Sequence, residues 1–329
     1  MSNVILYSPS IATSNVGDRI IYQYCSKAIR KIFPCEALVE FPTQIPTSNK
    51  MLNRFKDVEK RFVCGSNLLQ SNMFFALSRR GIATHAIRQW DISLSTAGKY
   101  ASAILLGCGW QSYSKGINLY TKALWRKVLS KDYIHSVRDN YTLEKLKSIG
   151  IDNVINTGCP TTWALTPEFC KNIPTKKAPN AVVTVTDYRP DIQSDEKMLR
   201  TVVENYDKVW LWLQGVEDKK YFEQFSDDIK SKVILVAPQL ESYDDILSNN
   251  DVDYIGARLH GGIHALNNKK RTIIIGVDNR AIEMQKDINL NVMTRSNLEH
   301  LQAEIYSEKA TDIKISIDNI ALFLNQFKC

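Results

Sequence analysis

The residues with the clearest capacity for chemistry lie in residues 251–278, DVDYIGARLHGGIHALNNKKRTIIIGVD. The pattern predicts a buried strand, a turn, a helix at about 261–267 and a second apolar strand. Arg258, Leu259 and His260 occupy the turn between the first strand and the helix. Ligands bind at this edge of open α/β sheets, and a helix N-terminus favours anions there. A guanidinium and an imidazole in such a turn indicate an enzyme that handles a carboxylate or a phosphate.

Each of these side chains also has a purely structural interpretation. Arg258 could be a structural cap that pairs with Asp253 or Asp278, and His260 could be a hydrogen-bonded core histidine. His264 lies four residues after His260 on the same helical face, and such a pair can bind a metal ion. Because no third ligand is evident, we predict no metal site and a packing role for His264.

Three further candidate residues lie in the first half of the chain. Asn15 and Asp18 belong to a Gly-containing loop after the first predicted strand, where they are either ligand-binding residues or ordinary turn and cap residues. Arg138 follows another predicted strand and either binds an anion or pairs with the neighbouring Asp139.

Two basic segments have less specific interpretations. The run Lys-Lys-Arg at 269–271 precedes a strand, so it belongs to the opposite sheet edge from the Arg-Leu-His turn and we interpret it as a solvated corner. Residues 118–129 predict an amphipathic helix with basic side chains at Lys122, Arg126 and Lys127. This basic face is either ordinary surface or a contact with an anionic membrane.

Length and composition limit the class of protein. A chain of 329 residues with 44% hydrophobic residues can form two domains with sizeable cores, which excludes disorder. We find no pattern of a secretory signal and no run near the roughly 18 apolar residues of a membrane span. Seven scattered cysteines without a C-x-x-C pair predict reduced thiols and a cytoplasmic protein, and Cys108 and Trp110 are expected to be packing residues. The formal charge of +7 fits an anionic substrate or an acidic membrane surface and is too diffuse to indicate nucleic acid.

Apolar strands alternate with helical segments in both halves of the chain. This alternation predicts parallel sheets with right-handed crossovers. We therefore predict an α/β protein with two doubly wound, Rossmann-like domains that face each other across a cleft. Proline and polar residues at 166–180 indicate a linker. The predicted boundaries are an N-terminal domain at 1–165, the linker at 166–180, a C-terminal domain at 181–309, and a C-terminal helix at 310–329 that could cross back to the first domain.

Four separated segments are similar to segments of the polysaccharide pyruvyl transferase family. They are Asn15-Val16-Gly17-Asp18, Ser136-Val137-Arg138-Asp139, Thr157-Gly158-Cys159-Pro160, and Arg258-Leu259-His260 with the following strand to Asp278. They follow the family's order and span nearly the whole chain. The chain departs from the family's pattern at Ser14, where the family usually has Gly, and at Cys159, where it usually has Asp before the proline.

The resemblance implies a fold like that of the GT-B glycosyltransferases, with phosphoenolpyruvate as donor and a sugar as acceptor. The implied reaction forms a pyruvate ketal across two hydroxyls of one sugar, in a surface polysaccharide such as a capsule or exopolysaccharide, or in its lipid-linked precursor. It requires no metal or other cofactor. In the family's pattern Arg138, Arg258, Leu259 and His260 line the donor site.

The chemistry of these side chains fits that implication. Phosphoenolpyruvate carries a phosphate and a carboxylate, and Arg138 and Arg258, from opposite domains, could each hold one of them bidentately. His260 is the expected general acid that protonates the methylene carbon. Asn15 and Asp18 are expected on the acceptor side.

Two other function classes remain open on sequence grounds. A GT-B glycosyltransferase with a nucleotide-sugar donor would share the architecture, but no convincing acidic pair for a ribose follows the Arg-Leu-His turn. A non-catalytic carbohydrate-binding or scaffold protein would not require the combination of anion-binding and acidic groups. The expected partners are phosphoenolpyruvate and a sugar acceptor, lipid-linked or free, without nucleic acid. Peripheral contact with the inner face of the cell membrane is an open alternative.

Overall fold

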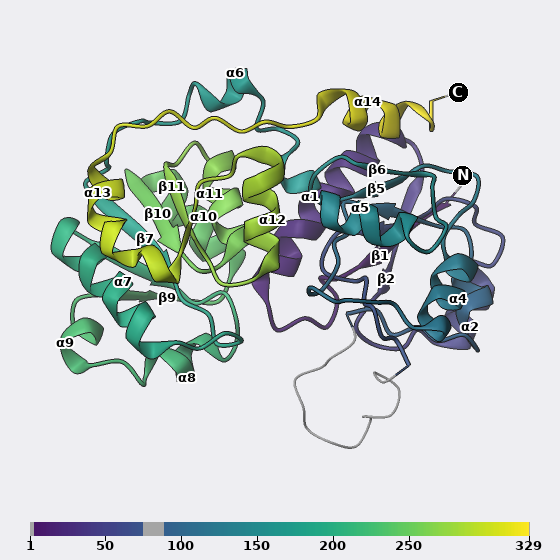
Figure 1. Cartoon of the computed structure of the whole chain (residues 1–329), viewed down its shortest axis with the longest axis horizontal. Helices are drawn as coiled ribbons and strands as arrows, with labels where there is room; N and C mark the ends of the chain where they lie inside the picture. The colour runs from purple at the N-terminus through teal and green to yellow at the C-terminus, as the bar shows by residue number, and fades with distance from the viewer. Residues whose placement is uncertain (1–2, 75–88, 329) are drawn as a thin grey trace. The chain divides into compact units, whose positions relative to one another are not determined.

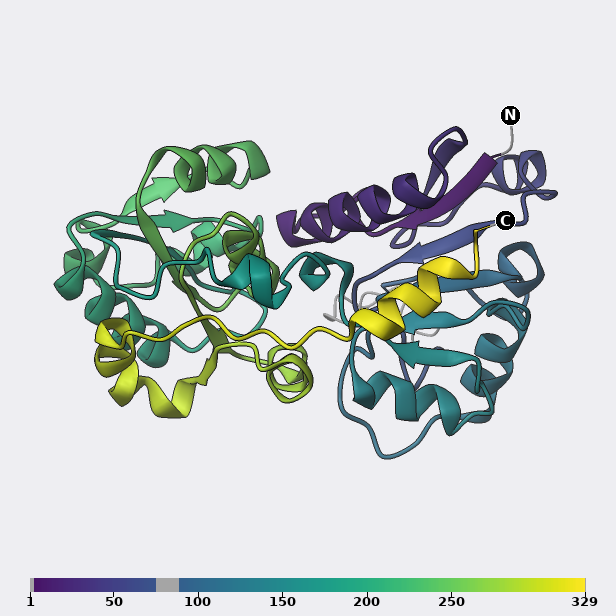
Figure 2. The ribbon, with the colours of Figure 1, turned by 90° about the horizontal axis from the view of Figure 1, so that it is seen from above.

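The structure is a computed structural model that describes residues 3–74 and 89–328. Its contacts divide the chain into two compact units, drawn in Figures 1 and 2. The first unit comprises Met1–Thr13, Ile21–Trp163 and Ser316–Cys329, and the second comprises Ser14–Ile20 and Ala164–Ile315. Both units are built on parallel sheets, which confirms the predicted α/β class with two Rossmann-like folds.

Within the described residues, the sheet of the first unit has the strand order β2-β1-β3-β4, and a separate pair joins β5 to β6. A parallel bridge between Cys108 and Val137 connects the end of β4 to β5, so the two pieces continue one another. The strands are β1 (Asn3–Ser8), β2 (Ala37–Pro42), β3 (Arg61–Cys64), β4 (Ala103–Leu106), β5 (His135–Val137) and β6 (Val154–Asn156).

The helices of the first unit begin at residues suited to capping. Asn118 and Asp139 accept backbone N–H groups at the starts of α4 and α5, as side-chain oxygens do at helix N-caps. The helical elements are α1 (Val16–Ile32), whose first turns group with the second unit, α2 (Asn49–Arg54), η1 (Ala97–Tyr100), α4 (Leu119–Val128), α5 (Asn140–Lys147), η2 (Pro160–Thr162) and α14 (Ile317–Asn325). None of the described helices has the length and apolar character needed to cross a membrane.

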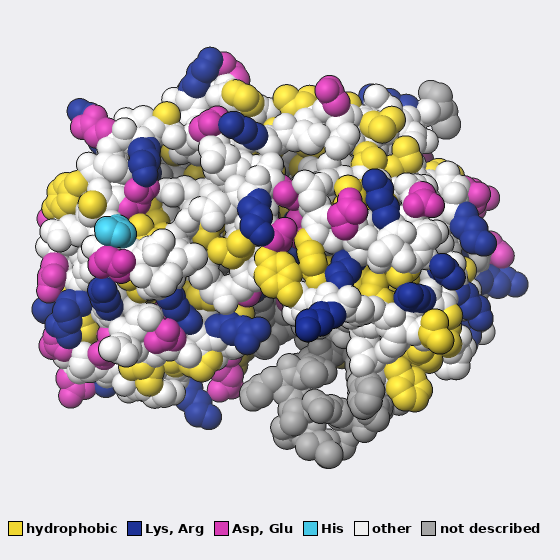
Figure 3. Space-filling view, viewed as in Figure 1, with side chains coloured by type: hydrophobic (Ala, Val, Ile, Leu, Met, Phe, Trp, Pro, Cys, Tyr) yellow, Lys and Arg dark blue, Asp and Glu magenta, His cyan; other side chains and the backbone are white. Residues whose placement is uncertain are grey.

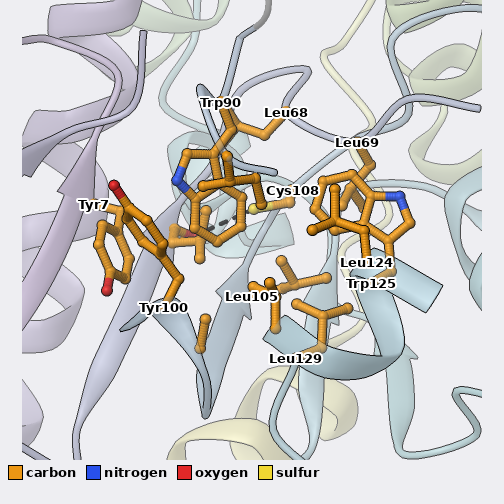
Figure 4. Close-up of a cluster of buried hydrophobic side chains, with 14 of the residues drawn as sticks. Tyr7, Leu68, Leu69, Trp90, Tyr100, Leu105, Cys108, Leu124, Trp125 and Leu129 are labelled. Atoms are coloured by element: carbon orange, nitrogen blue, oxygen red, sulfur yellow. Dashed lines mark hydrogen bonds between the residues drawn. The ribbon is translucent and has the colours of Figure 1, made fainter. Parts of the chain in front are cut away.

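Aromatic side chains fill the core on one face of this sheet (Figure 4). The rings of Trp90 and Trp125 stack with centroids 6.1 Å apart, and Tyr7 packs against Trp90 at 5.4 Å. Cys108 lies in the same cluster and donates its thiol to the Val63 carbonyl at 3.2 Å. Cys108 and Trp110 are both buried, so the prediction that they are packing residues is confirmed.

His135 is a fully buried titratable group in the first unit. Its Nδ1 accepts the Leu105 N–H at 3.2 Å, and its Nε2 lies 2.9 Å from the Ser130 carbonyl oxygen. These contacts require the neutral ring with its proton on Nε2, because Nδ1 faces a donor. Burial lowers the pKa of His135 to about 4, although the Ser130 carbonyl opposes this effect.

The C-terminal helix α14 packs on the first unit. Its Phe323 is buried in a cluster with Val4 and Phe62, and Asn319 donates to the Asn156 carbonyl of β6 at 2.8 Å. Figure 2 shows this yellow helix beside β6. The predicted return of the C-terminal helix to the first domain is therefore confirmed.

The six strands of the second unit lie in the order β12-β11-β10-β7-β8-β9, and every neighbouring pair is parallel. Counted along this unit, the order is 6-5-4-1-2-3, which is the strand order of dinucleotide-binding Rossmann folds. The strands are β7 (Asn180–Thr184), β8 (Val209–Trp212), β9 (Ile234–Val236), β10 (Val252–Gly256), β11 (Thr272–Gly276) and β12 (Val292–Thr294).

Alternate residues of these buried strands face two helical layers (Figure 1). Ala181 and Val183 contact the layer with α7, α8, α9 and α13, whereas Tyr254 and Ile274 on the other face meet α11. The helical elements are α6 (Pro167–Cys170), α7 (Ile192–Asn205), α8 (Asp218–Phe222), α9 (Asp227–Lys230), α10 (Leu240–Asn249), α11 (Leu259–Asn267), α12 (Asn279–Ile288), η3 (Arg295–His300) and α13 (Leu301–Tyr306).

The division into units differs in detail from the predicted boundaries. The second unit begins at Ala164 and includes the segment expected to be a linker, which contains the short helix α6. It also includes Ser14–Ile20, which the prediction placed in the N-terminal domain. The proline-rich composition at 166–180 reflects a helix start and turns rather than a free connection.

Candidate active site

The candidate site lies at the carboxyl edge of the second unit's sheet, where β7 and β10 are neighbours. In this strand order the helices that follow these two strands lie on opposite sides of the sheet, and ligands bind at that switch point. Gly256 ends β10, and the Arg258 N–H contacts Thr184 Oγ1 at the end of β7 at 3.2 Å. An added Cβ at Gly256 would lie 2.2 Å from that oxygen, so the close approach of the two strands requires glycine.

The Arg258 guanidinium is buried and forms ion pairs with two carboxylates. Its Nε donates to the Val185 carbonyl at 3.2 Å, and its Nη2 contacts Asp187 Oδ1 at 2.7 Å and Asp218 Oδ1. Arg258 is 3% exposed, and its Nη1 has no hydrogen-bond partner within residues 3–74 and 89–328. The structural alternative named Asp253 or Asp278 as its partner, and both are wrong, because those carboxylates pair with other arginines.

Asp218 connects the Arg258 guanidinium to the turn after β8. Its carboxylate accepts the N–H groups of Gly215 at 2.7 Å, Gln214 at 3.1 Å and Asp187 at 3.1 Å. Burial raises the pKa of Asp218 to about 6, and the charge of Arg258 opposes this effect. The Asp218 side chain therefore fixes the Gln214–Gly215 turn and the arginine at the same time.

A second guanidinium, that of Arg280, reaches the same edge from the first turn of α12, the helix that follows β11. Arg280 Nη2 lies 2.5 Å from both Asp278 Oδ2 and the Tyr188 hydroxyl. The Tyr188 ring has the Arg258 Cζ at 5.0 Å from its centroid and the Arg280 Cζ at 5.4 Å. Against the lowering effect of burial, Asp278 and Tyr188 raise the pKa of Arg280. Two permanent cations thus share one aromatic ring at the sheet edge.

Leu259 and His260 form the first turn of α11, and both are 5% exposed. The helix begins without a side-chain cap at Arg258, and its N-terminus carries a partial positive charge. Gly261 and Gly262 allow this turn to pack tightly, since an added Cβ at Gly262 would lie 2.8 Å from Ile274 Cγ1. The helix start and its histidine are therefore fixed in position against the sheet.

Asn15 and Asp18 lie in the second unit, not in the first as predicted. Asn15 Oδ1 accepts the Gln214 Nε2 at 2.9 Å and the Gly17 N–H at 3.0 Å. Asp18 occupies the first turn of α1, and its charge adds to the effect of Asp278 on the pKa of Arg280. The structure therefore brings Asn15 and Asp18 into the same unit as Arg258, Leu259 and His260.

Arg138 belongs to the first unit, at the end of β5, and is 2% exposed. Its Nε donates to Asp139 Oδ2 at 3.0 Å and its Nη1 to Asn67 Oδ1 at 2.6 Å. Its guanidinium covers Gly109, where an added Cβ would lie 2.2 Å from Cζ. Of the two alternatives, the structure contains the pairing with Asp139. A role of Arg138 toward a donor stays a prediction.

His264, the second histidine of the H-x-x-x-H pair, contacts side chains of α10. Its Nε2 lies 2.6 Å from Asp244 Oδ1 of α10, and its ring packs 5.8 Å from that of Tyr243. The described part of the chain contains no group of three or more His, Cys, Asp or Glu side chains arranged to hold a metal ion.

The interpretation of residues 269–271 as a solvated corner is wrong for Arg271. Its side chain is 8% exposed, and its Nη2 lies 2.5 Å from Oδ2 of Asp253, the second residue of β10. Asp253 also accepts the Tyr206 hydroxyl at 2.6 Å. A buried carboxylate requires such partners, so this arginine is part of the core.

Sequence reasoning missed Asp187, Asp218, Tyr188 and Arg280. Each follows the carboxyl end of a parallel strand, so position relative to the predicted strands was a usable signal. It could not identify the partners, because Arg258 lies 71 residues from Asp187 and 40 from Asp218 in the sequence.

Comparisons with known proteins agree with this fold and add a family. The UDP-GlcNAc 2-epimerase of Methanocaldococcus jannaschii has a similar structure, with a TM-score of 0.53, 12% sequence identity and coverage of 96% of this chain and 95% of that one. The structure of S. aureus MnaA with UDP is also similar, with a TM-score of 0.53, 11% sequence identity and coverage of 100% of this chain and 96% of that one. These similarities concern the fold alone.

A search of curated protein sequences found no match. The profile of the family described as polysaccharide pyruvyl transferase matches residues 15–279, which include all four segments that carry the resemblance. The matched range covers most of the chain and contains both the Asn15 loop and the Arg258 turn. The chain therefore belongs to the polysaccharide pyruvyl transferase family.

Proposed function

We propose that this protein transfers the enolpyruvyl group of phosphoenolpyruvate to two hydroxyls of a sugar, in a surface polysaccharide or its lipid-linked precursor. The product is a pyruvate ketal, and phosphate is released. Membership of the family supports a transferase of polysaccharide biosynthesis. The observation that carries the choice of donor is the pair of guanidinium groups, Arg258 and Arg280, on one tyrosine ring at the switch point of the sheet.

The donor is a small molecule with a phosphate and a carboxylate, and the site offers a cation for each. Arg258 uses Nε and Nη2 for protein contacts, which leaves the two N–H groups of Nη1 for an anion. The start of α11 adds backbone N–H groups and a favourable dipole. Arg280 supplies the second guanidinium. Leu259 and His260 then contact the three-carbon unit from the first turn of α11.

The chemical step begins with a proton. His260 protonates the methylene carbon, so that the neighbouring carbon becomes oxocarbenium-like and accepts the first sugar hydroxyl. The carbon–oxygen bond to phosphate then breaks, and the second hydroxyl attacks the same carbon. Of the two hydroxyl protons, one restores His260 and the other leaves with the phosphate, so the reaction consumes no further reagent.

The experiment measures phosphate release from phosphoenolpyruvate with and without candidate acceptor glycosides, and mass spectrometry identifies the ketal. We expect release only with an acceptor, and a loss of about 10²–10⁴-fold in His260→Ala, the usual contribution of a general acid. His300→Ala is the matched control, because the His300 side chain is 74% exposed and lies outside the site. Wild-type turnover in a folded His260→Ala protein would exclude His260 as the acid.

A nucleotide-sugar donor is tested in the same preparation by thermal stabilisation. Ligand present at 100 times its Kd stabilises the folded state by about 2.7 kcal/mol. We expect this stabilisation with phosphoenolpyruvate and none with UDP or GDP. Stabilisation by a nucleotide alone would replace the proposal with a glycosyltransferase. Stabilisation by phosphoenolpyruvate without turnover across a broad acceptor panel would indicate a non-catalytic binding protein.

A further inference from the structure

A surface of the first unit around helix α4 carries much of the protein's positive charge. Residues 113–153 contain eight basic and four acidic side chains, and within this set Arg138 and Asp139 are buried against each other. More than half of the formal net charge of +7 therefore lies in this segment. Its exposed or partly exposed basic residues are Lys115, Lys122, Arg126, Lys127, Lys131, Lys145 and Lys147.

The solvent face of α4 combines this charge with an apolar tip. Leu119, Lys122 and Arg126 recur at helical spacing on the face opposite the buried Leu124, and Lys127 is exposed at the border of that face. No acidic residue occurs in α4 itself. Leu119 is 83% exposed, the highest value among the described large hydrophobic residues that are exposed.

Two exposed aromatic rings extend the apolar surface at the start of α4. Phe74 is 53% exposed and packs at 5.3 Å against Tyr120, which follows Leu119 in the helix. Tyr113 is also 53% exposed and packs at 5.0 Å against Tyr141. Each ring packs against another ring while about half of the residue stays exposed, so the apolar groups are held in place at the surface.

The basic residues surround these groups on both sides of the helix. Lys115, Lys122 and Lys145 border one shallow hollow, and Arg126 and Lys131 border another. Figure 3 shows Lys and Arg side chains gathered with hydrophobic ones on the part of the surface over α4. We name this surface, with Phe74, Tyr113, Leu119 and the basic residues from Lys115 to Lys147, the α4 face.

We propose that the α4 face binds the surface of an anionic lipid bilayer. A bilayer interface offers two environments that match the side chains of the α4 face. Its anionic headgroups attract the lysines, and its apolar boundary can bury Leu119, Phe74 and Tyr113. Long basic side chains lie along such an interface with their charges in water. This inference stands on the first unit's surface alone and does not depend on the identity of the donor.

Two features favour a bilayer over a nucleic acid. Six of the seven basic side chains are lysines, which act as point charges, whereas bidentate recognition of individual phosphates favours arginine. An aliphatic side chain as exposed as Leu119 gains nothing from a phosphate backbone, but it is removed from water at the acyl boundary.

The test is co-sedimentation of the full chain with vesicles of phosphatidylcholine alone or with 30 mol% phosphatidylglycerol. We expect binding to the anionic vesicles only, and loss of that binding in 0.5 M salt, because the attraction is screened. Each basic residue near such a surface changes the partition coefficient about fivefold, which corresponds to ~1 kcal/mol. The double variant Lys122→Glu/Lys127→Glu should therefore bind at least about 25-fold more weakly.

Two matched variants separate the contributions of charge and apolar contact. Lys197→Glu/Lys208→Glu makes the same change in net charge at exposed positions of the second unit, and it should bind like the wild type. Leu119→Ser should weaken binding without changing its salt dependence. Equal losses in the two double variants, or equal binding to neutral and anionic vesicles, would overturn the proposal. So would variant-sensitive binding to single-stranded DNA with no binding to vesicles. Circular dichroism confirms that each variant is folded.

Discussion

The substitution Gly215→Ala tests whether the candidate site depends on the position of the Arg258 guanidinium. Gly215 lies in the turn after β8, and an added Cβ would stand 2.6 Å from Arg258 Nη2, 3.3 Å from Asp187 Oδ1 and 3.4 Å from Asp218 Oδ2. The Gly215 backbone does not need a positive φ, so alanine adds a methyl group without backbone strain. The substitution therefore moves Arg258 and leaves its chemistry intact.

The size of the effect of Gly215→Ala follows from the tight packing around the Arg258 guanidinium. To reach ordinary van der Waals contact, the Nη2 atom must move by roughly 1 Å, and Arg258 cannot move into solvent because it is 3% exposed. Overpacking of this kind costs about 1–3 kcal/mol of stability. A misplacement of about 1 Å in a positioning group can reduce the rate about 10²-fold, or ~2.7 kcal/mol of transition-state stabilisation.

The assay is kcat/KM for phosphoenolpyruvate-dependent phosphate release, together with the free energy of unfolding from urea titration. Gly98→Ala is the matched control, because an added Cβ at Gly98 has no heavy atom within 4 Å. We expect Gly98→Ala to change stability by less than about 0.5 kcal/mol and to keep wild-type activity. Gly215→Ala should lose about 10²-fold in kcat/KM while most of the protein remains folded.

Three results would refute this reasoning. Wild-type kcat/KM in a folded Gly215→Ala protein would show that the reaction does not depend on where Arg258 is held. A similar loss in Gly98→Ala would show that the assay responds to small structural changes anywhere in the chain. Activity lost in proportion to the unfolded fraction would mean that the arginine's role is structural.

Three further predictions use the same preparations. Gly109→Ala displaces the Arg138 guanidinium, since the added Cβ would lie 2.2 Å from its Cζ. If Arg138 acts on the donor, kcat/KM should fall at least tenfold. An unchanged kcat/KM would show that Arg138 does not belong to the site. Burial lowers the pKa of His135 to about 4 in the folded state. The neutral ring therefore contributes fully to stability above pH 6.5, and about 3 kcal/mol of the free energy of unfolding is lost as the pH falls to 4. Urea titrations should show this pH dependence in the wild type and not in His135→Gln. Asp218→Asn should cost about 3–5 kcal/mol of unfolding free energy, because it breaks a buried ion pair. Asp187→Asn should cost only about 1 kcal/mol, because the Asp187 side chain is 31% exposed. Equal losses in the two variants would contradict this difference in burial.

The fold and the edge of the sheet that carries the candidate site were predictable from the sequence. Strand–helix alternation gives parallel sheets, and parallel strands place all their following loops at one edge. The Arg258 turn was found because it lies between a continuous apolar strand and a helix with two glycines. These are local patterns, and they need no information about which strands are neighbours.

The partners of the arginines depend on strand order, which the local pattern does not contain. Arg258 meets Asp187 because β10 pairs with β7, and the intervening β8 and β9 lie on the other side of β7. One such partner did have a signal in the sequence. Asp253 interrupts the apolar run of a central strand, and a carboxylate there needs a buried cation, which proved to be Arg271.

The loop after the first strand of the second unit also bears on how the proposed donor, an anion smaller than a nucleotide, would bind to this fold. In dinucleotide-binding units a glycine-rich turn after the first strand brings backbone N–H groups to the pyrophosphate. The corresponding loop here, after β7, contains Asp187 and Tyr188, and no glycine occurs between Gly158 and Gly215. This loop therefore cannot form that backbone cradle, and the anion must be bound by side chains. Arg258, Tyr188 and Arg280 occupy the place of the cradle. Under the proposed function, these guanidinium groups therefore select a compact dianion, and the loop does not form a surface for a ribose and a base.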